Sequence, residues 1–92
     1  MKQGESMPRI SAFFGIVIRM FYNDHSPPHF HAEYGEHEAV YEIETIEVSR
    51  GKLPRRAHAL VVEWTTLHQF ELMGNWDRAR QGLPLRSIEP LD

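Results

Sequence analysis

The chain reads HFHAEYGEHEAVYEI from residue 29 to residue 43, and polar and apolar side chains alternate along most of this stretch. Alternation with a period of two is typical of strands that bury one face. Gly35 and Glu36 lie between the two halves, and glycine in the first position of a two-residue loop suits a type II′ turn. The pattern therefore predicts an antiparallel hairpin in which Phe30 pairs with Tyr41.

The segments on either side of this hairpin add further strands. Residues 11–21 are rich in β-branched and aromatic residues, which predicts a single strand covered on much of both faces. Residues 46–48 are expected to form a short strand before a turn at residues 49–51. Residues 85–92 alternate enough to form an added edge strand or a docking peptide.

One long helix is predicted from Leu53 to about Arg80, because apolar residues recur there at helical spacing. Pro54 suits the first helical position, and Gly82 is expected to cap the end. Gly74 predicts a weak point or a bend late in the helix. Strands followed by one helix predict an α+β fold, in which a small antiparallel sheet of three to four strands carries the helix on one face.

Length and composition limit the classes of protein to which the chain can belong. Its 92 residues make one domain, expected over residues 7–92 after a disordered polar tail at residues 1–6. The chain has no cysteine, which excludes disulfide scaffolds, thiolate metal sites and cysteine nucleophiles. A net charge of -3 gives no overall basic field for nucleic acid. No apolar leader or membrane-spanning run is visible, so we expect a cytoplasmic protein without membrane contact.

Three histidines lie close together in the sequence, at His25, His29 and His31. His29 and His31 are two apart on a predicted strand, so they share one face with Glu33. These three side chains can chelate a divalent transition metal, namely Zn²⁺, Mn²⁺, Fe²⁺ or Ni²⁺. The predicted register also places Glu33 opposite Glu38, which is unfavourable unless a cation lies nearby. The alternative is a solvated sheet face with hydrogen bonds between histidine and glutamate.

The same histidines allow a second chemistry. His25, His29 and His31 can supply a general base and a general acid, as a metal-independent ribonuclease requires. Phosphate would be held by four cations near the predicted helix start, which are Arg50, Lys52, Arg55 and Arg56. The alternative is that these cations form a solvated, charged turn. His68 lies beside the apolar stripe of the helix and is expected to be packed rather than catalytic.

Apolar residues in the second half of the chain indicate a third possibility, a protein-binding module. The candidate docking residues are two tryptophans of the helix and two apolar residues of the C-terminal segment, Trp64, Trp76, Ile88 and Leu91. A chain this short has a thin core, so a partner protein or a homodimer would stabilise it.

The string DHSPPHFH at residues 24–31 closely resembles a family of small prokaryotic proteins called domain of unknown function 4160. The resemblance continues at residues 51–54, 63–64, 75–76 and 88–91, and it runs from residue 7 to the end. It implies a partner, because such proteins are often encoded beside a second small protein, domain of unknown function 2442, in suspected toxin–antitoxin pairs. It also makes a toxin acting on RNA or translation plausible, but it supplies no catalytic residue.

The favoured hypothesis is therefore a partner in a two-protein, toxin–antitoxin-like module that acts by protein–protein binding. The alternatives are a histidine-dependent ribonuclease-like toxin and a metal-binding protein that uses the histidine face.

Overall fold

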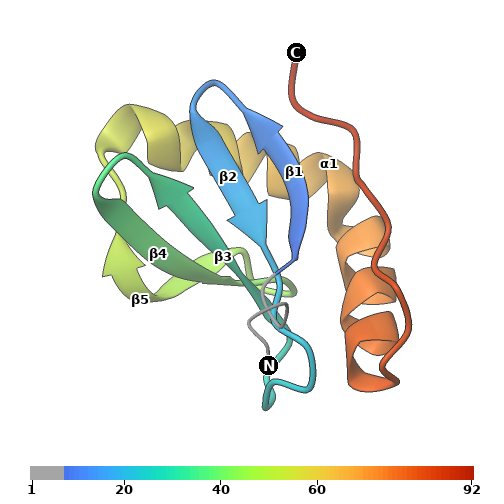
Figure 1. Ribbon diagram of the computed structural model, residues 1–92. Helices are drawn as coiled ribbons and strands as arrows, with labels where there is room; N and C mark the ends of the chain where they lie inside the picture. The colour runs from blue at the N-terminus through green and yellow to red at the C-terminus, as the bar shows by residue number, and fades with distance from the viewer. Residues whose placement is uncertain (1–7) are drawn as a thin grey trace.

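The computed structural model describes residues 8–92 (Figure 1), so the predicted tail at residues 1–6 lies outside the described residues. The described chain forms one antiparallel sheet followed by one helix, which makes the fold α+β, as predicted. The sheet has five strands in chain order rather than three or four. The elements are β1 (Arg9–Phe13), β2 (Ile16–Arg19), β3 (His29–Tyr34), β4 (His37–Glu42), β5 (Glu47–Lys52) and α1 (Arg55–Arg80).

The prediction of a single strand over residues 11–21 is wrong, because the chain turns back at Phe14 and Gly15 and forms both β1 and β2. Phe14 and Gly15 have φ angles of 51° and 81°, in the left-handed region. An aromatic residue rarely adopts this conformation, so the run of apolar residues conceals the turn. This hairpin supplies the additional strand.

The turn predicted at residues 49–51 is also wrong, because these residues lie inside β5. Gly51 has a φ of +74°, and a Cβ atom built on it would lie 2.2 Å from the carbonyl oxygen of Glu38 on β4. The glycine therefore permits close approach of two strands rather than a change of direction.

The central hairpin has the predicted register. Phe30 pairs with Tyr41 and Glu33 with Glu38 across β3 and β4. Gly35 begins the turn with a φ of +59°, and a type II′ turn requires a positive φ at that position. Alternation along these strands thus assigns each side chain to one face of the sheet, as predicted.

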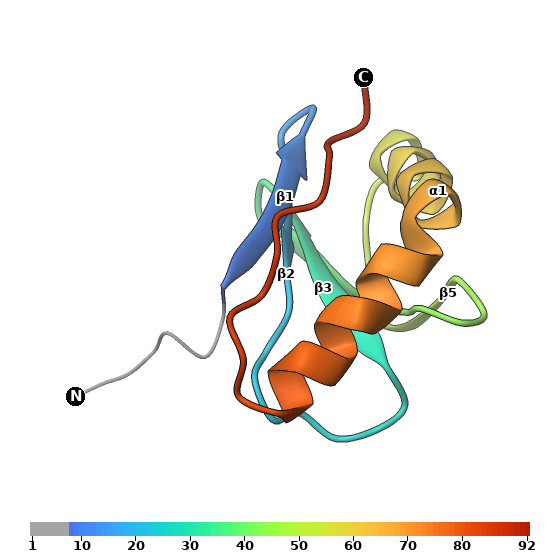
Figure 2. The ribbon, with the colours of Figure 1, turned by 90° about the vertical axis from the view of Figure 1, so that its right-hand side faces the viewer.

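The hydrophobic core lies between one face of the sheet and α1 (Figure 2). Trp64 of α1 is fully buried at its centre, and its ring lies 5.3 Å from that of Phe13 and 5.8 Å from that of Phe30. Phe30 also stacks on Tyr41 at 5.5 Å. Since side chains alternate along each strand, His31 and Glu33 of β3 belong to the opposite face from Phe30.

Helix α1 begins at Arg55, directly after Pro54, so the proline precedes the helix rather than opening it. The helix bends at His68, where φ and ψ are -125° and 23°, and not at Gly74 as predicted. The hydroxyls of Thr65 and Thr66 donate to backbone carbonyls four residues earlier, at 2.7 and 2.8 Å. Such bonds bend helices, which explains why the kink follows the threonine pair.

The end of α1 has the hydrogen bonds of a Schellman motif. Gly82 has a φ of +73°, and its N–H donates to the carbonyl of Ala79 at 3.3 Å. The N–H of Leu83 donates to the carbonyl of Arg78 at 2.9 Å. The predicted capping role of Gly82 is therefore confirmed.

The C-terminal segment is not a strand of the sheet, although it runs beside β1 (Figure 2). The N–H of Ile88 in this segment donates to the carbonyl of Ile10 at 2.8 Å, and Trp64 Nε1 donates to the carbonyl of Glu89 at 2.9 Å. The segment therefore docks on its own domain. Within residues 8–92, no helix is long and apolar enough to cross a membrane.

Candidate metal centre

The loop between β2 and β3 carries Asp24 and is held by the C-terminal end of α1. The N–H of Asn23 donates to the carbonyl of Ala79 at 3.3 Å, and Arg80 contacts the hydroxyl of Ser26 at 3.4 Å. Asp24 Oδ1 accepts a hydrogen bond from the N–H of His25 at 2.9 Å. These contacts place the Asp24 carboxylate beside the first residues of β3.

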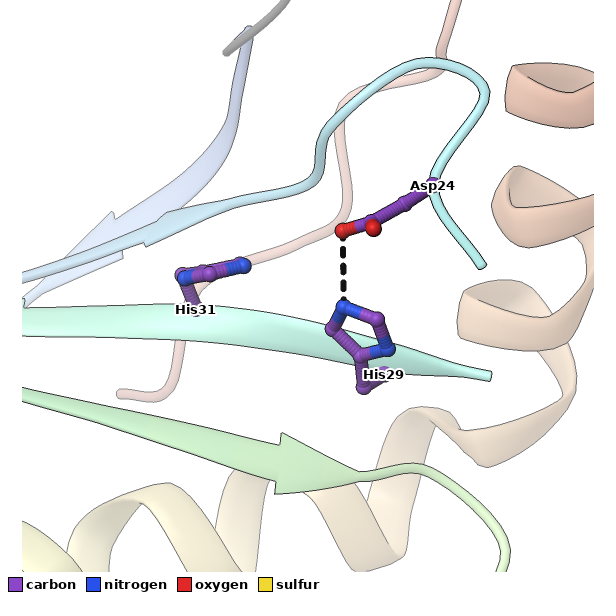
Figure 3. A group of neighbouring side chains, drawn as sticks. All are labelled: Asp24, His29 and His31. Atoms are coloured by element: carbon purple, nitrogen blue, oxygen red, sulfur yellow. Dashed lines mark hydrogen bonds and ion pairs between the residues drawn. The ribbon is translucent and has the colours of Figure 1, made fainter. Parts of the chain in front are cut away.

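Asp24, His29 and His31 converge at this point (Figure 3). Each offers one ligand atom, and these atoms all lie within 4.8 Å of one another. His29 Nε2 is 2.8 Å from Asp24 Oδ2. The side chains are mostly shielded from solvent, with 17% of Asp24, 11% of His29 and 8% of His31 exposed. Two imidazoles and one carboxylate therefore meet in a space that a single ion can fill.

The tautomer of His29 follows from its other contact. Nδ1 lies 2.7 Å from the carbonyl oxygen of Pro27, which can only accept, so Nδ1 carries a proton. In the neutral ring, Nε2 then presents a lone pair to the Asp24 carboxylate. Two acceptors 2.8 Å apart repel, so a proton or a cation must lie between them.

His31 is oriented in the same way. Its Nδ1 lies 3.2 Å from Glu38 Oε2, so the ring donates to the carboxylate from this nitrogen. Its Nε2 is buried and has no hydrogen-bond partner among the described residues. Phe21 stacks on the ring at 4.4 Å and restricts its orientation. A carboxylate behind one histidine nitrogen, with the other nitrogen free, is the arrangement that metal-binding histidines adopt.

The ionisation of Asp24 suits a metal ligand. Burial raises the pKa of this carboxyl, but the backbone N–H of His25 and the nearby rings of His29 and His25 lower it, and the net effect is a pKa below the usual value. Asp24 is therefore a carboxylate at neutral pH, which is the form that binds cations.

The three residues line an open pocket of about 390 Å³. Its walls include the apolar side chains of Phe21, Pro27 and Val40, and Arg50 of β5 also lines it. His25 lines the pocket as well, with its side chain 92% exposed and Nδ1 3.1 Å from Asp24 Oδ1. The structure thus brings the three predicted histidines to one pocket.

Glu33, the predicted third ligand, is not part of this group. Its Oε1 lies 3.2 Å from Arg19 Nε on the neighbouring strand β2, so the cation expected near the Glu33–Glu38 pair is an arginine. Asp24 takes its place from a loop. The signal for Asp24 was its position just before His25, but sequence periodicity cannot place a loop residue relative to a strand.

The four predicted phosphate-binding cations are divided between β5 and α1. Arg50 and Lys52 lie on β5, where they pair with Val40 and Glu38, respectively. Arg55 and Arg56 lie in the first turn of α1, and Arg56 lines a different pocket. Among these four, only Arg50 lines the pocket that contains the histidines.

The predicted docking residues lie largely inside the protein. Trp64, Trp76 and Ile88 are at most 4% exposed and belong to the core, and Leu91 is partly buried against it. His68 contacts Glu71 and lies 5.5 Å from the Trp64 ring, so it is packed, as expected. The Trp76 ring lies 5.1 Å from that of His29, which links α1 to the candidate metal centre.

Comparison with known proteins gives a family but no function. No curated protein matches the chain, and no solved structure matches it. The profile described as "Domain of unknown function (DUF4160)" matches residues 15–77, a stretch that includes Asp24, His29 and His31. Because the match covers more than half of the sequence, the chain belongs to the DUF4160 family.

Proposed function

We propose that this protein binds a divalent transition-metal ion through Asp24 Oδ2, His29 Nε2 and His31 Nε2. The observation that carries the proposal is the buried Nε2 of His31, which has no partner among the described residues while its Nδ1 bonds to Glu38. An unpaired buried polar atom costs about 1–3 kcal/mol. A ligated metal removes this cost.

A proton alone does not satisfy the site. A proton on His29 Nε2 would bridge to Asp24, but it would leave His31 Nε2 unpaired. A proton on His31 Nε2 would create a buried N–H without an acceptor, which is no better. One cation that accepts three lone pairs satisfies all three ligand atoms at once, since they lie within 4.8 Å of one another.

The donor set restricts the choice of metal. Two imidazoles and one carboxylate suit Zn²⁺, Fe²⁺, Ni²⁺ or Mn²⁺ rather than Ca²⁺ or Mg²⁺, which prefer oxygen ligands. Three protein ligands leave at least one coordination position open, as in catalytic rather than structural zinc sites. The pocket beside the ligands gives that position access to a small molecule.

Metal titration of the untagged protein, followed by calorimetry, tests the proposal. We expect one ion per chain, and we expect Asp24→Asn to weaken binding by at least about 100-fold, since even the loss of a residue that only orients a ligand costs about 10- to 100-fold. The matched control is Glu33→Gln, because Glu33 pairs with Arg19 outside the group. Equal loss in both variants, or no binding by the parent protein, would contradict the proposal.

The ribonuclease-like alternative uses the same histidines as proton carriers. It predicts that RNA is cleaved in the presence of a chelator and that His29→Ala abolishes the cleavage. Activity restored by added metal instead would favour the metal-binding function.

A partner role is proposed as a second function, and the exposed residues of α1 favour it. Phe70 is 93% exposed and Leu67 is 65% exposed, so a protein contact would lie here rather than at the buried tryptophans. Coexpression with a protein of the domain of unknown function 2442 family, the partner that the resemblance implies, followed by size-exclusion chromatography with light scattering, tests this role. A stable complex lost in Phe70→Ser supports it, and a monomer that ignores the second protein contradicts it.

A further inference from the structure

We infer that the metal-loaded pocket binds a phosphate monoester, whose phosphate bridges the metal ion and the guanidinium of Arg50. This inference rests on the proposed metal site. It assigns the class of ligand that occupies the open coordination position.

The position of Arg50 in the sheet is the first observation. Arg50 pairs with Val40, and Val40 pairs with His31, so Arg50 lies two strands away from the metal ligand on the same face. Two inter-strand spacings correspond to about 10 Å between the backbones. The Arg50 side chain comes from one side of this gap and the metal ion would lie on the other side, which leaves room for one small anion between them. Arg50 and His31 line the same pocket.

Arg50 is also an available cation. Its residue is exposed, and it forms no ion pair within the part of the chain that the structure describes. By contrast, Arg19 on the same face contacts Glu33. The guanidinium of Arg50 therefore has its planar set of donors free, and this set matches phosphate oxygens in a bidentate manner.

The charges around the pocket make anion binding depend on the metal. Asp24 and Glu42 supply two negative charges, and Arg50 supplies one positive charge. The metal-free pocket is therefore negative overall when its histidines are neutral. A divalent ion offsets this negative charge, including that of Glu38 behind His31, and it adds a Lewis acid at the position that an anion would reach.

The pocket walls indicate an organic group on the phosphate. Phe21, Pro27 and Val40 line the pocket with apolar surface, which inorganic phosphate cannot use. The volume of about 390 Å³ lies at the lower end of the range for small-molecule sites. A compact phosphate monoester uses the metal, the arginine and the apolar wall together, whereas a free carboxylate has fewer oxygens with which to bridge two cations.

Ligand binding to the Co²⁺-loaded protein tests the inference, because the visible spectrum of Co²⁺ reports a change of coordination. The probes are phenyl phosphate, inorganic phosphate and acetate. We expect phenyl phosphate to bind most tightly, to change the Co²⁺ spectrum and to bind only when the metal is present. Arg50→Gln should weaken phenyl phosphate binding about tenfold or more, the effect of losing a charged hydrogen bond, without weakening Co²⁺ binding. The control Arg55→Gln should change neither, because Arg55 lies in α1 and does not line this pocket.

The outcomes separate the two proposals. If the parent protein binds no Co²⁺, both the metal site and the phosphate pocket are refuted. If Co²⁺ binds but Arg50→Gln keeps the full affinity for phenyl phosphate, only the present inference is refuted. If acetate binds as tightly as phenyl phosphate, the assignment to phosphate is wrong and the metal site stands.

Discussion

Replacement of His31 by leucine should change the stability of the protein in opposite directions with and without metal. In the metal-free chain, the variant removes a buried Nε2 that has no partner, and such an atom costs about 1–3 kcal/mol. It also removes the contact of Nδ1 with Glu38, which is 3.2 Å long and is worth about 0.5–1.5 kcal/mol. The Glu38 side chain is 55% exposed, so water replaces the lost bond.

The balance favours the variant by about 1 kcal/mol in the metal-free state, which corresponds to a rise in Tm of about 4–8 °C for a domain of this size. Metal binding should reverse the order of stability of the parent protein and the variant. An ion at about 100 times its Kd stabilises the parent protein by about 2.7 kcal/mol, whereas a variant that has lost one ligand gains little. The parent protein should therefore have a lower Tm than His31→Leu in a chelator and a higher Tm than this variant in saturating Zn²⁺.

Thermal unfolding followed by circular dichroism, in chelator and in Zn²⁺, measures this reversal. The control is His58→Leu, because His58 Nδ1 lies 2.8 Å from the hydroxyl of the buried Tyr41 and is therefore satisfied. Loss of that partner should destabilise the protein by about 1–3 kcal/mol in both conditions. If metal-free His31→Leu is destabilised as much as His58→Leu, the free Nε2 is not a cost to the fold, and the reasoning that leads to the metal site fails.

Three further predictions concern residues near the site and in the core. Glu38→Gln should weaken metal binding about 10- to 100-fold, measured by calorimetry, because Glu38 orients His31, with little change in metal-free stability. Gly51→Ala should destabilise the protein by at least about 2 kcal/mol in urea unfolding, since the residue has a φ of +74° and its new Cβ would meet the Glu38 carbonyl. Burial raises the pKa of Tyr41 from 10.0 to about 12, so the folded state favours the neutral phenol. The stability that the neutral phenol contributes is therefore present below pH 10 and is lost as the pH rises towards 12. Tyr41→Phe should flatten this alkaline loss in denaturant titrations, and an unchanged pH profile would contradict the assignment.

The sequence predicted the fold where one physical rule acted alone. Strict alternation on both sides of Gly35 determined the register of β3 and β4, because a slip by one residue would bury the charged side chains. The rule failed in residues 11–21, where Phe14 adopts a left-handed conformation in an apolar run. It failed again at Gly51, where the glycine serves strand contact rather than a turn. The first error merged β1 and β2 into one strand, which is why the expected sheet was too small, and the second error shortened β5.

The candidate site was predictable where its residues share a strand. His29 and His31 follow from a spacing of two, and the structure places both on β3. The third ligand did not follow, because Glu33 also satisfies that spacing but faces Arg19 on β2. The choice between Glu33 and Asp24 depends on a loop held by the end of α1, more than fifty residues later in the chain, and no local pattern contains that contact.

This dependence on the helix end predicts that the proposed metal binding is sensitive to a distant glycine. The carbonyl of Ala79 accepts hydrogen bonds from the N–H of Gly82, which caps α1, and from the N–H of Asn23, which precedes Asp24. Gly82→Ala places a side chain at a φ of +73°, where nothing lies within 4 Å of the new Cβ, so its effect comes from the backbone alone. Gly35→Ala is matched to it, with a φ of +59° and the same open space, but it lies in the β3–β4 turn away from the loop.

Both glycine variants should lower the free energy of unfolding by about 1–2 kcal/mol, the cost of a left-handed residue other than glycine. Only Gly82→Ala should also weaken metal binding, because a shifted Ala79 carbonyl moves the Asn23 amide and the Asp24 carboxylate away from His29 and His31. Calorimetric metal titration of the two variants, at a temperature where both are folded, makes the comparison. Equal metal affinities in the two would mean that Asp24 is positioned by its own loop, and that the end of α1 contributes to stability alone.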